Sequence, residues 1–355
     1  MIDKDFCMSS YLAYRYIEKD DVDFKEGLKH ATESVFSNGN ETLVYTAEDI
    51  AKAYKKAFEE KENQGVKFGL LLSGGMDSAC LAAFMKPETD VYTFRFPDGF
   101  RNEEAERAAK YAKHYGHKLH YVDINWDVVE KNIDILMENK GAPVHSIEPQ
   151  LLEAALQAKK DGVEMMVAGD GSDLAFGGMD KMLSKDWTYD EWKEFYTFCN
   201  PKKVLKNPID VDYLFERYKL PNNGIDYIRF ITEVFGIESS RTYCNAFRTA
   251  DMKYKPFYDP SGMVKMAEPL DLNRIRNGES KYLIRDLFKI CYPEIPIPEK
   301  IPMPRPVDKY FENWKGPTRP EFIENLDMSQ FTGNQKWQLW CLERFLNNLD
   351  NRYNA

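Results

Sequence analysis

The sequence predicts an α/β fold in which a doubly wound, mostly parallel sheet is followed by a helical C-terminal region. Between residues 65 and 182, short apolar runs alternate with helix-length amphipathic segments, and a glycine-rich turn follows the first run. After residue 183, aromatic residues become dense and strand-like runs largely vanish. Alternating strands and helices of this length imply parallel strands joined by helical crossovers. Ligands of such sheets bind beyond the carboxyl ends of the strands.

Each element of the alternating part has its own local signal. The apolar runs predict four strands, at residues 66–72, 90–96, 118–123 and 164–168. The segments after them predict helices at residues 77–85, 128–138 and 150–160, and a further helix that Asn102 caps and that buries a face of alanines. Three domains follow, namely a helical N-terminal extension over 1–64 with a helix at 51–60, a nucleotide-binding domain over 65–182, and a helical region over 183–355 with helices at 280–289 and 335–347.

Composition narrows the class of protein. The 355 residues are 43% hydrophobic, which is ample for one large or two modest cores. A formal net charge of −10 argues against broad binding to nucleic acid or to anionic membranes. The six cysteines form no CxxC pair, so neither a zinc site nor a redox dithiol is expected, and no apolar run reaches membrane-spanning length. We therefore expect a cytoplasmic protein with free thiols.

Residues 73–78, Ser-Gly-Gly-Met-Asp-Ser, follow the first strand and open a helix. Gly74 and Gly75 allow the backbone to approach a polyphosphate closely, and the N–H groups at the helix start point at the anion. The hydroxyl groups of Ser73 and Ser78 add hydrogen bonds. Asp77 would be repelled by bare phosphate, so its presence implies an intervening Mg²⁺. The alternative is a plain glycine turn between a strand and a helix.

This loop resembles the pyrophosphate-binding loop (PP-loop) of the N-type ATP pyrophosphatases, which include asparagine, GMP, NAD and argininosuccinate synthetases. The resemblance implies an adenine nucleotide alpha-hydrolase-like fold that cleaves ATP between its α- and β-phosphates. By similarity of position, Leu72, Phe96 and Gly169 would flank the nucleoside. The loop alone does not choose among these enzymes.

A second glycine-rich run, residues 168–179, follows the fourth strand and resembles the asparagine synthetase pattern Gly-Glu-Gly-Ala/Ser-Asp-Glu-Leu-Phe-Gly-Gly. It would bring Asp173 to the sheet edge that holds Asp77, so that two carboxylates could hold one Mg²⁺-pyrophosphate or two metal ions. The alternative is a glycine-rich turn with incidental acidic residues. Asp170 replaces the usual Glu, and Leu174 replaces an acidic residue. The second change is closer to β-lactam and carbapenam synthetases, although those relatives carry Tyr at the position of Asp170.

Three later segments also resemble the asparagine synthetase C-terminal domain. They are residues 253–259, where Lys253 replaces an Arg, residues 278–285 with the Gly-x-x-Lys-x-x-Leu-Arg spacing approximately kept, and residues 297–303. The last places Lys300 where the family has a lysine facing the phosphates of ATP. The resemblance thus implies that Lys300 neutralises charge that develops on pyrophosphate.

Other candidate residues have weaker signals. His114, His117 and His120 straddle a helix end and a strand start, so their side chains should diverge as surface histidines rather than form a metal cluster. His145 lies before the second glycine-rich run and is a candidate lining residue of the substrate pocket. Cys7 is internal and is not expected to be a glutaminase nucleophile.

The motifs together predict a stand-alone ligase of asparagine synthetase type that uses ATP and Mg²⁺. A substrate carboxylate would attack the α-phosphorus, and an amine would then attack the acyl-adenylate, with Asp170 accepting its proton. The phosphate loop begins by residue 73, which leaves no room for a glutaminase domain before it. We therefore expect free ammonia, a separate glutaminase or an amine on the substrate as nitrogen source. Two alternatives stay open: amidation or thiolation of a non-aspartate metabolite, and an inactive nucleotide-binding homologue.

Overall fold

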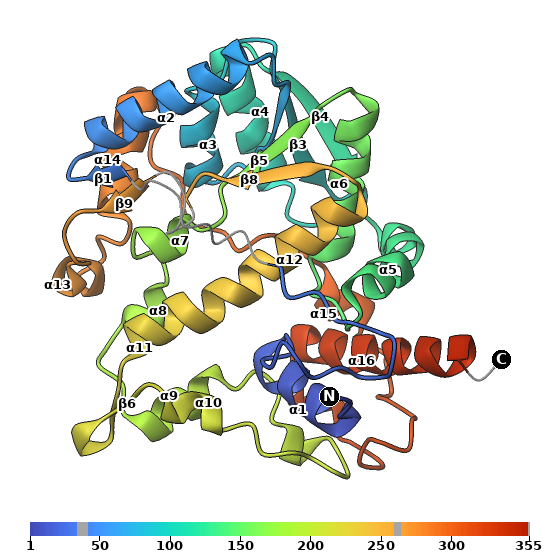
Figure 1. The fold of residues 1–355 in the computed structure, drawn as a ribbon. Helices are drawn as coiled ribbons and strands as arrows, with labels where there is room; N and C mark the ends of the chain where they lie inside the picture. The colour runs from blue at the N-terminus through green and yellow to red at the C-terminus, as the bar shows by residue number, and fades with distance from the viewer. Residues whose placement is uncertain (34–41, 259–263, 354–355) are drawn as a thin grey trace.

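The computed structural model describes residues 1–33, 42–258 and 264–353, and its centre is a five-stranded parallel sheet (Figure 1). The strand order is β4-β3-β2-β5-β8, and every neighbouring pair is parallel. The strands are β2 (Phe68–Leu71), β3 (Asp90–Arg95), β4 (Lys118–Asp123), β5 (Met165–Ala168) and β8 (Lys253–Pro256). The four predicted strands are thus confirmed.

Strand β8 was not predicted, because the sequence after residue 183 was expected to be largely without strands. Its sequence Lys-Tyr-Lys-Pro contains a proline and lacks an apolar run. Proline is tolerated in a strand that lies at the edge of a sheet, since one side of that strand needs no ladder hydrogen bonds. Because β8 pairs only with β5 in this sheet, its place at the edge explains both its composition and the missed prediction.

Side chains of the central strands alternate between two hydrophobic clusters, one on each face of the sheet. Leu70 and Leu72 belong to one cluster, whereas Leu71 belongs to the other. Val167 and Met166 divide in the same way. Successive residues of a strand point to opposite faces, so near-continuous apolar runs are the expected pattern for a sheet covered on both sides.

Helices cover both faces, as the predicted doubly wound fold requires. One face packs against α2 (Ala47–Asn63), α3 (Met76–Ala82), α4 (Glu103–Tyr115) and α14 (Tyr282–Cys291). The other packs against α5 (Trp126–Lys140), α6 (Glu148–Lys160) and α12 (Gly236–Thr249). The α/β class with a mostly parallel sheet is therefore confirmed, and each helix predicted in this part lies where the sequence placed it.

The chain order of the sheet creates a switch point between β2 and β5. From β2 the chain moves outward to β3 and β4, and it then returns to the other side of β2 to form β5 and β8. The loops that leave two such strands diverge and open a crevice at the carboxyl edge of the sheet. The two glycine-rich motifs are the segments that follow β2 and β5.

The rest of the chain is mainly helical and packs below the sheet (Figure 1). Helix α11 (Tyr227–Phe230), a π-helical turn η3 (Ile231–Phe235) and α12 form one continuous run. The two small sheets outside the central one join β1 (Thr42–Val44) to β9 (Val264–Met266) and β6 (Lys219–Leu220) to β7 (Gly224–Ile225). The remaining helices are short, except for the last one: α7 (Ser172–Ala175), α8 (Asp180–Leu183), α9 (Tyr189–Tyr196), η1 (Pro201–Lys203), α10 (Tyr213–Glu216), η2 (Pro221–Asn223), α13 (Leu272–Arg276), α15 (Val307–Tyr310), η4 (Met328–Gln330) and α16 (Gly333–Tyr353).

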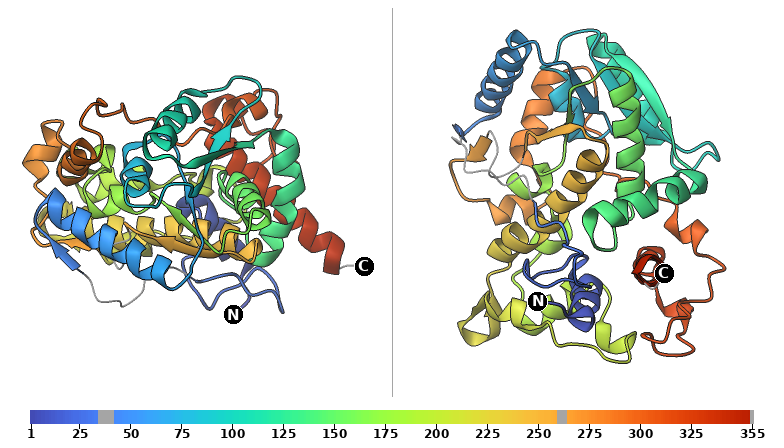
Figure 2. Two further views of the ribbon diagram at one scale, coloured as in Figure 1. Left: turned by 90° about the horizontal axis from the view of Figure 1, so that it is seen from above. Right: turned by 45° about the vertical axis from the view of Figure 1, so that its right-hand side comes forward.

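The first helix, α1 (Lys4–Tyr14), is far from the sheet and lies beside α16 from the other end of the chain (Figures 1 and 2). Asp3 caps α1, since its side chain accepts a hydrogen bond from the N–H of Phe6 at 2.9 Å. Arg15 ends the helix in a left-handed conformation. Residues 1–64 therefore hold α1, β1 and α2, and the described part of residues 15–33 contains no helix.

Candidate functional site

The phosphate loop forms a closed turn held by its own hydroxyl groups. The N–H of Ser73 donates to Oγ of Ser78 at 3.1 Å, and the N–H of Gly75 donates to Oγ of Ser73 at 3.3 Å. Gly74 has φ +78°, and a Cβ there would lie 2.1 Å from the carbonyl oxygen of Glu104. Only glycine fits this position, because the backbone is left-handed and lies against the start of α4.

The second glycine-rich run lies directly against the first. A Cβ on Gly169 would lie 2.9 Å from the backbone nitrogen of Ser78, so the two loops touch. The hydroxyl of Ser172 donates to Oδ1 of Asp77 at 2.7 Å. The structure thus brings Asp77 and Asp173, from different strands, to one edge of the sheet.

Lys281 joins these two carboxylates and is the residue that the sequence analysis missed. Its Nζ lies 2.7 Å from Oδ2 of Asp77 and 2.5 Å from Oδ1 of Asp173. The residue is only 5% exposed. Burial alone would lower the pKa of Lys281, but Asp77 and Asp173 outweigh burial and raise the pKa above its usual range. The ammonium group therefore stays charged between its two partners.

Lys300 contacts the same carboxylate from the solvent side. Its Nζ donates to Oδ1 of Asp173 at 2.9 Å and to the carbonyl of Gly178 at 2.6 Å, and its side chain is 50% exposed. Burial would raise the pKa of Asp173, but Lys281 and Lys300 more than offset burial and lower the pKa. Asp173 is consequently an ionised carboxylate with two cations beside one of its oxygen atoms.

The donor set suits Mg²⁺, which prefers carboxylate oxygen and retains several water molecules as ligands. Asp77 and Asp173 supply two carboxylates at the loop where a polyphosphate would lie. Within residues 1–33, 42–258 and 264–353, no group of three or more His, Cys, Asp and Glu side chains gathers as a metal site.

A single cavity of about 430 Å³ connects these loops with α12 and with the segment after α14. The end that adjoins the phosphate loop is called the nucleotide end below, and the end formed by Arg15, His145, Glu238 and Arg305 is called the acceptor end. The residues that line the cavity include Arg15, Leu71, Ser73, Gly75, Asp77, Ser78, Phe94, Glu104, Arg107, His145, Gly169, Asp170, Asp173, Glu238, Lys281, Lys300 and Arg305.

Asp170 also lines this cavity. Its carboxylate accepts a short hydrogen bond from the hydroxyl of Tyr254 on β8. Tyr254 stacks on Phe247 of α12 at a centroid distance of 4.6 Å, which fixes its ring. Burial and the charge of Asp170 together raise the pKa of Tyr254 well above its usual range, so the phenol stays protonated and donates. Asp170 is thus held as an acceptor whose carboxyl group lines the cavity.

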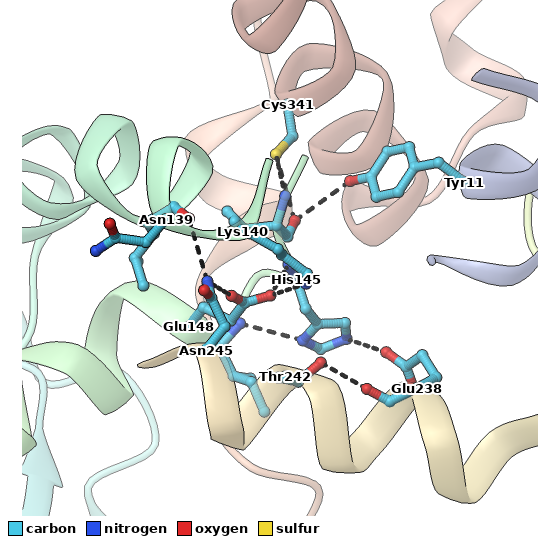
Figure 3. Close-up of polar contacts among 12 residues, drawn as sticks. Tyr11, Asn139, Lys140, His145, Glu148, Glu238, Thr242, Asn245 and Cys341 are labelled. Atoms are coloured by element: carbon cyan, nitrogen blue, oxygen red, sulfur yellow. Dashed lines mark hydrogen bonds and ion pairs between the residues drawn. The ribbon is translucent and has the colours of Figure 1, made fainter. Parts of the chain in front are cut away.

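The acceptor end combines charges from four separate segments. Nη2 of Arg15 lies 3.1 Å from Oε2 of Glu238 on α12, and Oε1 of that carboxylate lies 4.0 Å from Nε2 of His145 (Figure 3). Arg305 comes from the proline-rich segment between α14 and α15. His145 was predicted to line the pocket and does so, whereas no sequence signal had placed Arg15, Glu238 or Arg305 there.

Behind His145 lies a buried ion pair that holds its loop (Figure 3). Nζ of Lys140 lies 2.6 Å from Oε1 of Glu148, and both side chains are at most 5% exposed. The same carboxylate accepts one hydrogen bond from the backbone N–H of His145 at 2.7 Å and another from Nδ2 of Asn245 at 2.6 Å. Because Asn245 is on α12, this network joins the His145 loop to the helix that carries Glu238.

Three predicted nucleotide contacts do not line the cavity. Leu72 and Phe96 are 0% and 1% exposed, and neither they nor Gly74 belong to the lining, while Leu71, Phe94 and Gly75 do. Asn102, the expected cap of α4, instead bonds the backbone N–H and carbonyl of Phe96 at 3.0 Å each. The roles of Leu72 and Phe96 beside a nucleoside remain predictions.

The expectation of three surface histidines is wrong for His117, which is 9% exposed. Its Nε2 lies 2.9 Å from the carbonyl of Ala82 at the end of α3, because the turn at Gly116 directs the ring under that helix. His120 bonds Asp90 at 2.8 Å, and His114 is exposed beside Tyr115. The three rings therefore diverge, as predicted.

The six cysteines are free thiols, as the sequence predicts. Burial raises the pKa of each cysteine thiol for which a shift is resolved: Cys7, Cys80, Cys199, Cys244 and Cys341. Lys253 is exposed at the start of β8, and Asp259 lies outside the described residues. Among the residues that the structure describes, no helix has the length and apolar character needed to cross a bilayer.

Comparison with known proteins places these motifs in a family. A family model described as Asparagine synthase matches residues 49–229, slightly more than half of the chain. Asparagine synthetase [glutamine-hydrolyzing] 2 of Oryza sativa subsp. japonica is 28% identical over 159 residues, which are 40% of this chain and 26% of that protein. The asparagine synthetase [glutamine-hydrolyzing] of Asparagus officinalis is 29% identical over 158 residues, 39% of this chain and 26% of that protein.

The matched segment is short relative to these proteins, since the chain covers about a quarter of the length of the curated relatives named here. Among solved structures, the NMN synthetase from Francisella tularensis is similar with a TM-score of 0.27 and 12% identity, over 38% of this chain and 60% of that chain. Arg15, Glu238, Lys281, Lys300 and Arg305 all lie outside the residues that the family model matches.

Proposed function

This chain belongs to the asparagine synthase family, and from that premise we propose that it is an ATP-dependent ligase that activates a carboxylate as an acyl-adenylate. Ammonia or an amine would then take the acyl group and release AMP. The observation that carries the proposal is the contact between the two glycine-rich loops at the switch point of the sheet, with Asp77, Asp173, Lys281 and Lys300 gathered beside the phosphate loop.

The first half-reaction uses the nucleotide end. Ser73, Gly75 and Ser78 would bind the β- and γ-phosphates of ATP through N–H and hydroxyl groups. Mg²⁺, when bound with ATP, would be held by Asp77 and Asp173 and would neutralise phosphate charge. A carboxylate oxygen of the substrate forms a bond to the α-phosphorus, and the bond between that phosphorus and the bridging oxygen of pyrophosphate breaks. Lys281 and Lys300 stand beside the position where the negative charge of the leaving group grows.

The second half-reaction uses Asp170. The nitrogen of ammonia or of an amine attacks the carbonyl carbon of the adenylate, and the tetrahedral intermediate collapses with loss of AMP. A proton must leave the nitrogen during this step. Asp170 lines the cavity that holds both ends, and Tyr254 holds its carboxylate, so we assign Asp170 as the acceptor of that proton.

The test is exchange of labelled pyrophosphate into ATP, run with the pure protein, Mg²⁺ and a panel of carboxylic acids. We expect exchange that depends on one class of acid, and AMP with pyrophosphate as the products when ammonia is added. Exchange in the absence of any acid, or release of ADP with phosphate, would contradict acyl-adenylate formation. A product that gains the mass of sulfur would identify the thiolation alternative, and ATP binding without turnover across the panel would identify an inactive homologue.

A further inference from the structure

Arg305 lines the cavity and carries a positive charge that no described residue pairs with. Its guanidinium makes no hydrogen bond and no ion pair within 4.0 Å to any residue that the structure describes. Burial and the nearby charge of Arg15 together lower the pKa of Arg305 to about 10, and Glu238 and Tyr243 only partly oppose them. The group is still protonated at neutral pH. A mostly buried cation needs a partner, because removal from water is costly unless an anion or several acceptors compensate.

The neighbouring charges are already paired with one another. Arg15 bonds Glu238 at 3.1 Å and also packs over the ring of Phe198, with 5.0 Å between the guanidinium carbon and the ring centroid. Glu238 therefore directs one carboxylate oxygen to Arg15, and the other lies 4.0 Å from His145. Of the residues that form the acceptor end, two carry a guanidinium group and one a carboxyl group, whose pKa burial raises. A positive charge is therefore left for a ligand to neutralise.

The same place disfavours a second cation. Burial lowers the pKa of His145 well below its usual range, and Arg305, Arg15 and Lys140 lower it further. The imidazole is therefore neutral at physiological pH although Glu238 is close. An environment that rejects a proton on an imidazole would also disfavour the ammonium group of a ligand, because both would face the same cations.

We propose, on the basis of the ligase function proposed above, that Arg305 binds a second acidic group of the carboxylate substrate. The substrate class is a carboxylic acid with another carboxylate or a phosphate at its far end, and with no ammonium beside that group. The zwitterionic end of an amino acid would bring no net charge to Arg305, whereas a bare carboxylate or phosphate neutralises it. Guanidinium groups bind either anion through two parallel hydrogen bonds.

The position of Arg305 relative to Lys300 makes it a specificity-determining residue for this reaction. Lys300 contacts Asp173 at the nucleotide end, and Arg305 follows five residues later in the same segment, which has no helix or strand. Both side chains line one cavity. A diacid held by Arg305 thus occupies the same cavity as the phosphate loop, and Arg305 would select the acid without contacting ATP.

The proposal is tested by calorimetric binding to the full chain saturated with Mg²⁺ and a non-hydrolysable ATP analogue. Succinate, glutarate and phosphoglycolate represent the proposed class, butyrate is the monoacid of matched length, and aspartate and glutamate are the zwitterionic counterparts. We expect at least one dianion to bind roughly 10- to 100-fold more tightly than butyrate and than the amino acids. This is the gain in affinity expected from one additional hydrogen-bonded ion pair. The variant Arg305→Gln should lose that preference, and Arg305→Lys should keep part of it.

Arg217→Gln is the matched control, because Arg217 is 53% exposed and pairs with Glu18 away from the cavity. This control should bind like the unaltered protein, and all variants should bind the ATP analogue with unchanged affinity, which also shows that they are folded. Equal binding of succinate and butyrate, tighter binding of aspartate or glutamate, absence of binding by every dianion, or a preference that survives in Arg305→Gln would overturn the inference. Failure of pyrophosphate exchange with every acid would instead overturn the ligase function, so the two failures are distinguishable.

Discussion

The two ends of the cavity balance their charges in different ways. At the nucleotide end, two carboxylates and two lysines alternate within hydrogen-bond distance, so the protein neutralises its own charges. At the acceptor end, Arg15 and Glu238 form a pair, and Arg305 is left with no ion pair among the described residues. A self-neutral site can accept an ATP that arrives with its own cation, whereas an uncompensated guanidinium requires an anion. The difference therefore separates the site that we propose for ATP from the site that we propose for the acid.

The origin of the residues follows this division only in part, since His145 of the acceptor end lies within the segment that the family model matches. Ser73, Asp77, Asp170 and Asp173 lie within the segment that the family model matches. Lys281 and Lys300 of the nucleotide end lie outside it, as do Arg15, Glu238 and Arg305, which come from the end of α1, from α12 and from a loop after α14. The carboxylates of the nucleotide end thus follow strands of the central sheet, while three of the four residues that form the acceptor end come from the segments around it.

The largest effect should come from a change that separates the two half-reactions. Asp170→Asn keeps an acceptor for the hydroxyl of Tyr254 but removes the base. We expect amide formation to fall about 10²- to 10⁴-fold, the usual contribution of a general base, while exchange of pyrophosphate into ATP changes only a few-fold. Rapid-quench measurement of the product and the exchange assay give the two rates. An equal loss in both assays would mean that Asp170 serves the nucleotide end instead.

The next effect concerns the stability of the nucleotide end. Lys281→Met keeps the volume of the side chain but leaves Asp77 and Asp173 without their buried partner. Breaking a buried pair on one side costs about 3–5 kcal/mol, and we expect this loss in the free energy of unfolding from urea denaturation. Lys300→Met is the matched control, since it removes a 50% exposed cation from the same carboxylate and should cost less than about 1 kcal/mol. Similar costs for the two variants would show that burial does not distinguish these lysines.

Most of the fold and part of the site follow from local sequence. The four long apolar runs and the glycine-rich turns fix the strands, the switch point and the positions of Asp77 and Asp173, because these features depend on short-range periodicity and chain order. Lys281 was visible only as one member of a family motif, since nothing local shows that a lysine will be buried between two acids. The place of Arg305 in the cavity could not be predicted from the sequence. Its charge matters because no described residue pairs with it and because Arg15, which is 290 residues away in the sequence, is close to it.

A third prediction uses the pH dependence of the nucleotide end. Burial raises the pKa of Glu104 to about 8, and Arg107 and Arg101 only partly oppose this. Below the pKa that Glu104 has in the unfolded chain, its carboxyl group is protonated in both the folded and the unfolded state, so its ionisation does not change the free energy of unfolding there. Between about pH 4.5 and pH 8 the unfolded state ionises first, so Glu104 makes the protein less stable as the pH rises. Glu104→Gln should remove this penalty and raise the free energy of unfolding by about 2–4 kcal/mol at pH 8, with little change at pH 4.

Denaturation of both proteins at the two pH values checks the sign as well as the size. A gain at pH 4 that equals the gain at pH 8 would trace the effect to packing of the glutamine and not to ionisation. Glu104 is the one charged residue of the first turn of α4 that is buried, while Glu103 and Glu106 are less covered by protein. Glu103→Gln in the same turn is therefore the control, and its stability difference should not depend on pH to this extent.

The smallest effect should come from the network that holds the acceptor end in place. Asn245→Ala removes the 2.6 Å hydrogen bond to Glu148 and the 3.2 Å bond to the carbonyl of Leu136 (Figure 3). Loss of a buried hydrogen bond to a charged group costs about 1.5–3 kcal/mol. Because Glu148 also holds the N–H of His145, we expect KM for the acid to rise several-fold with KM for ATP unchanged. Asn139→Ala, on the exposed end of α5, is the control and should alter neither constant. A rise in KM for ATP that matches the rise for the acid would mean that the two ends of the cavity are coupled through this network rather than built separately.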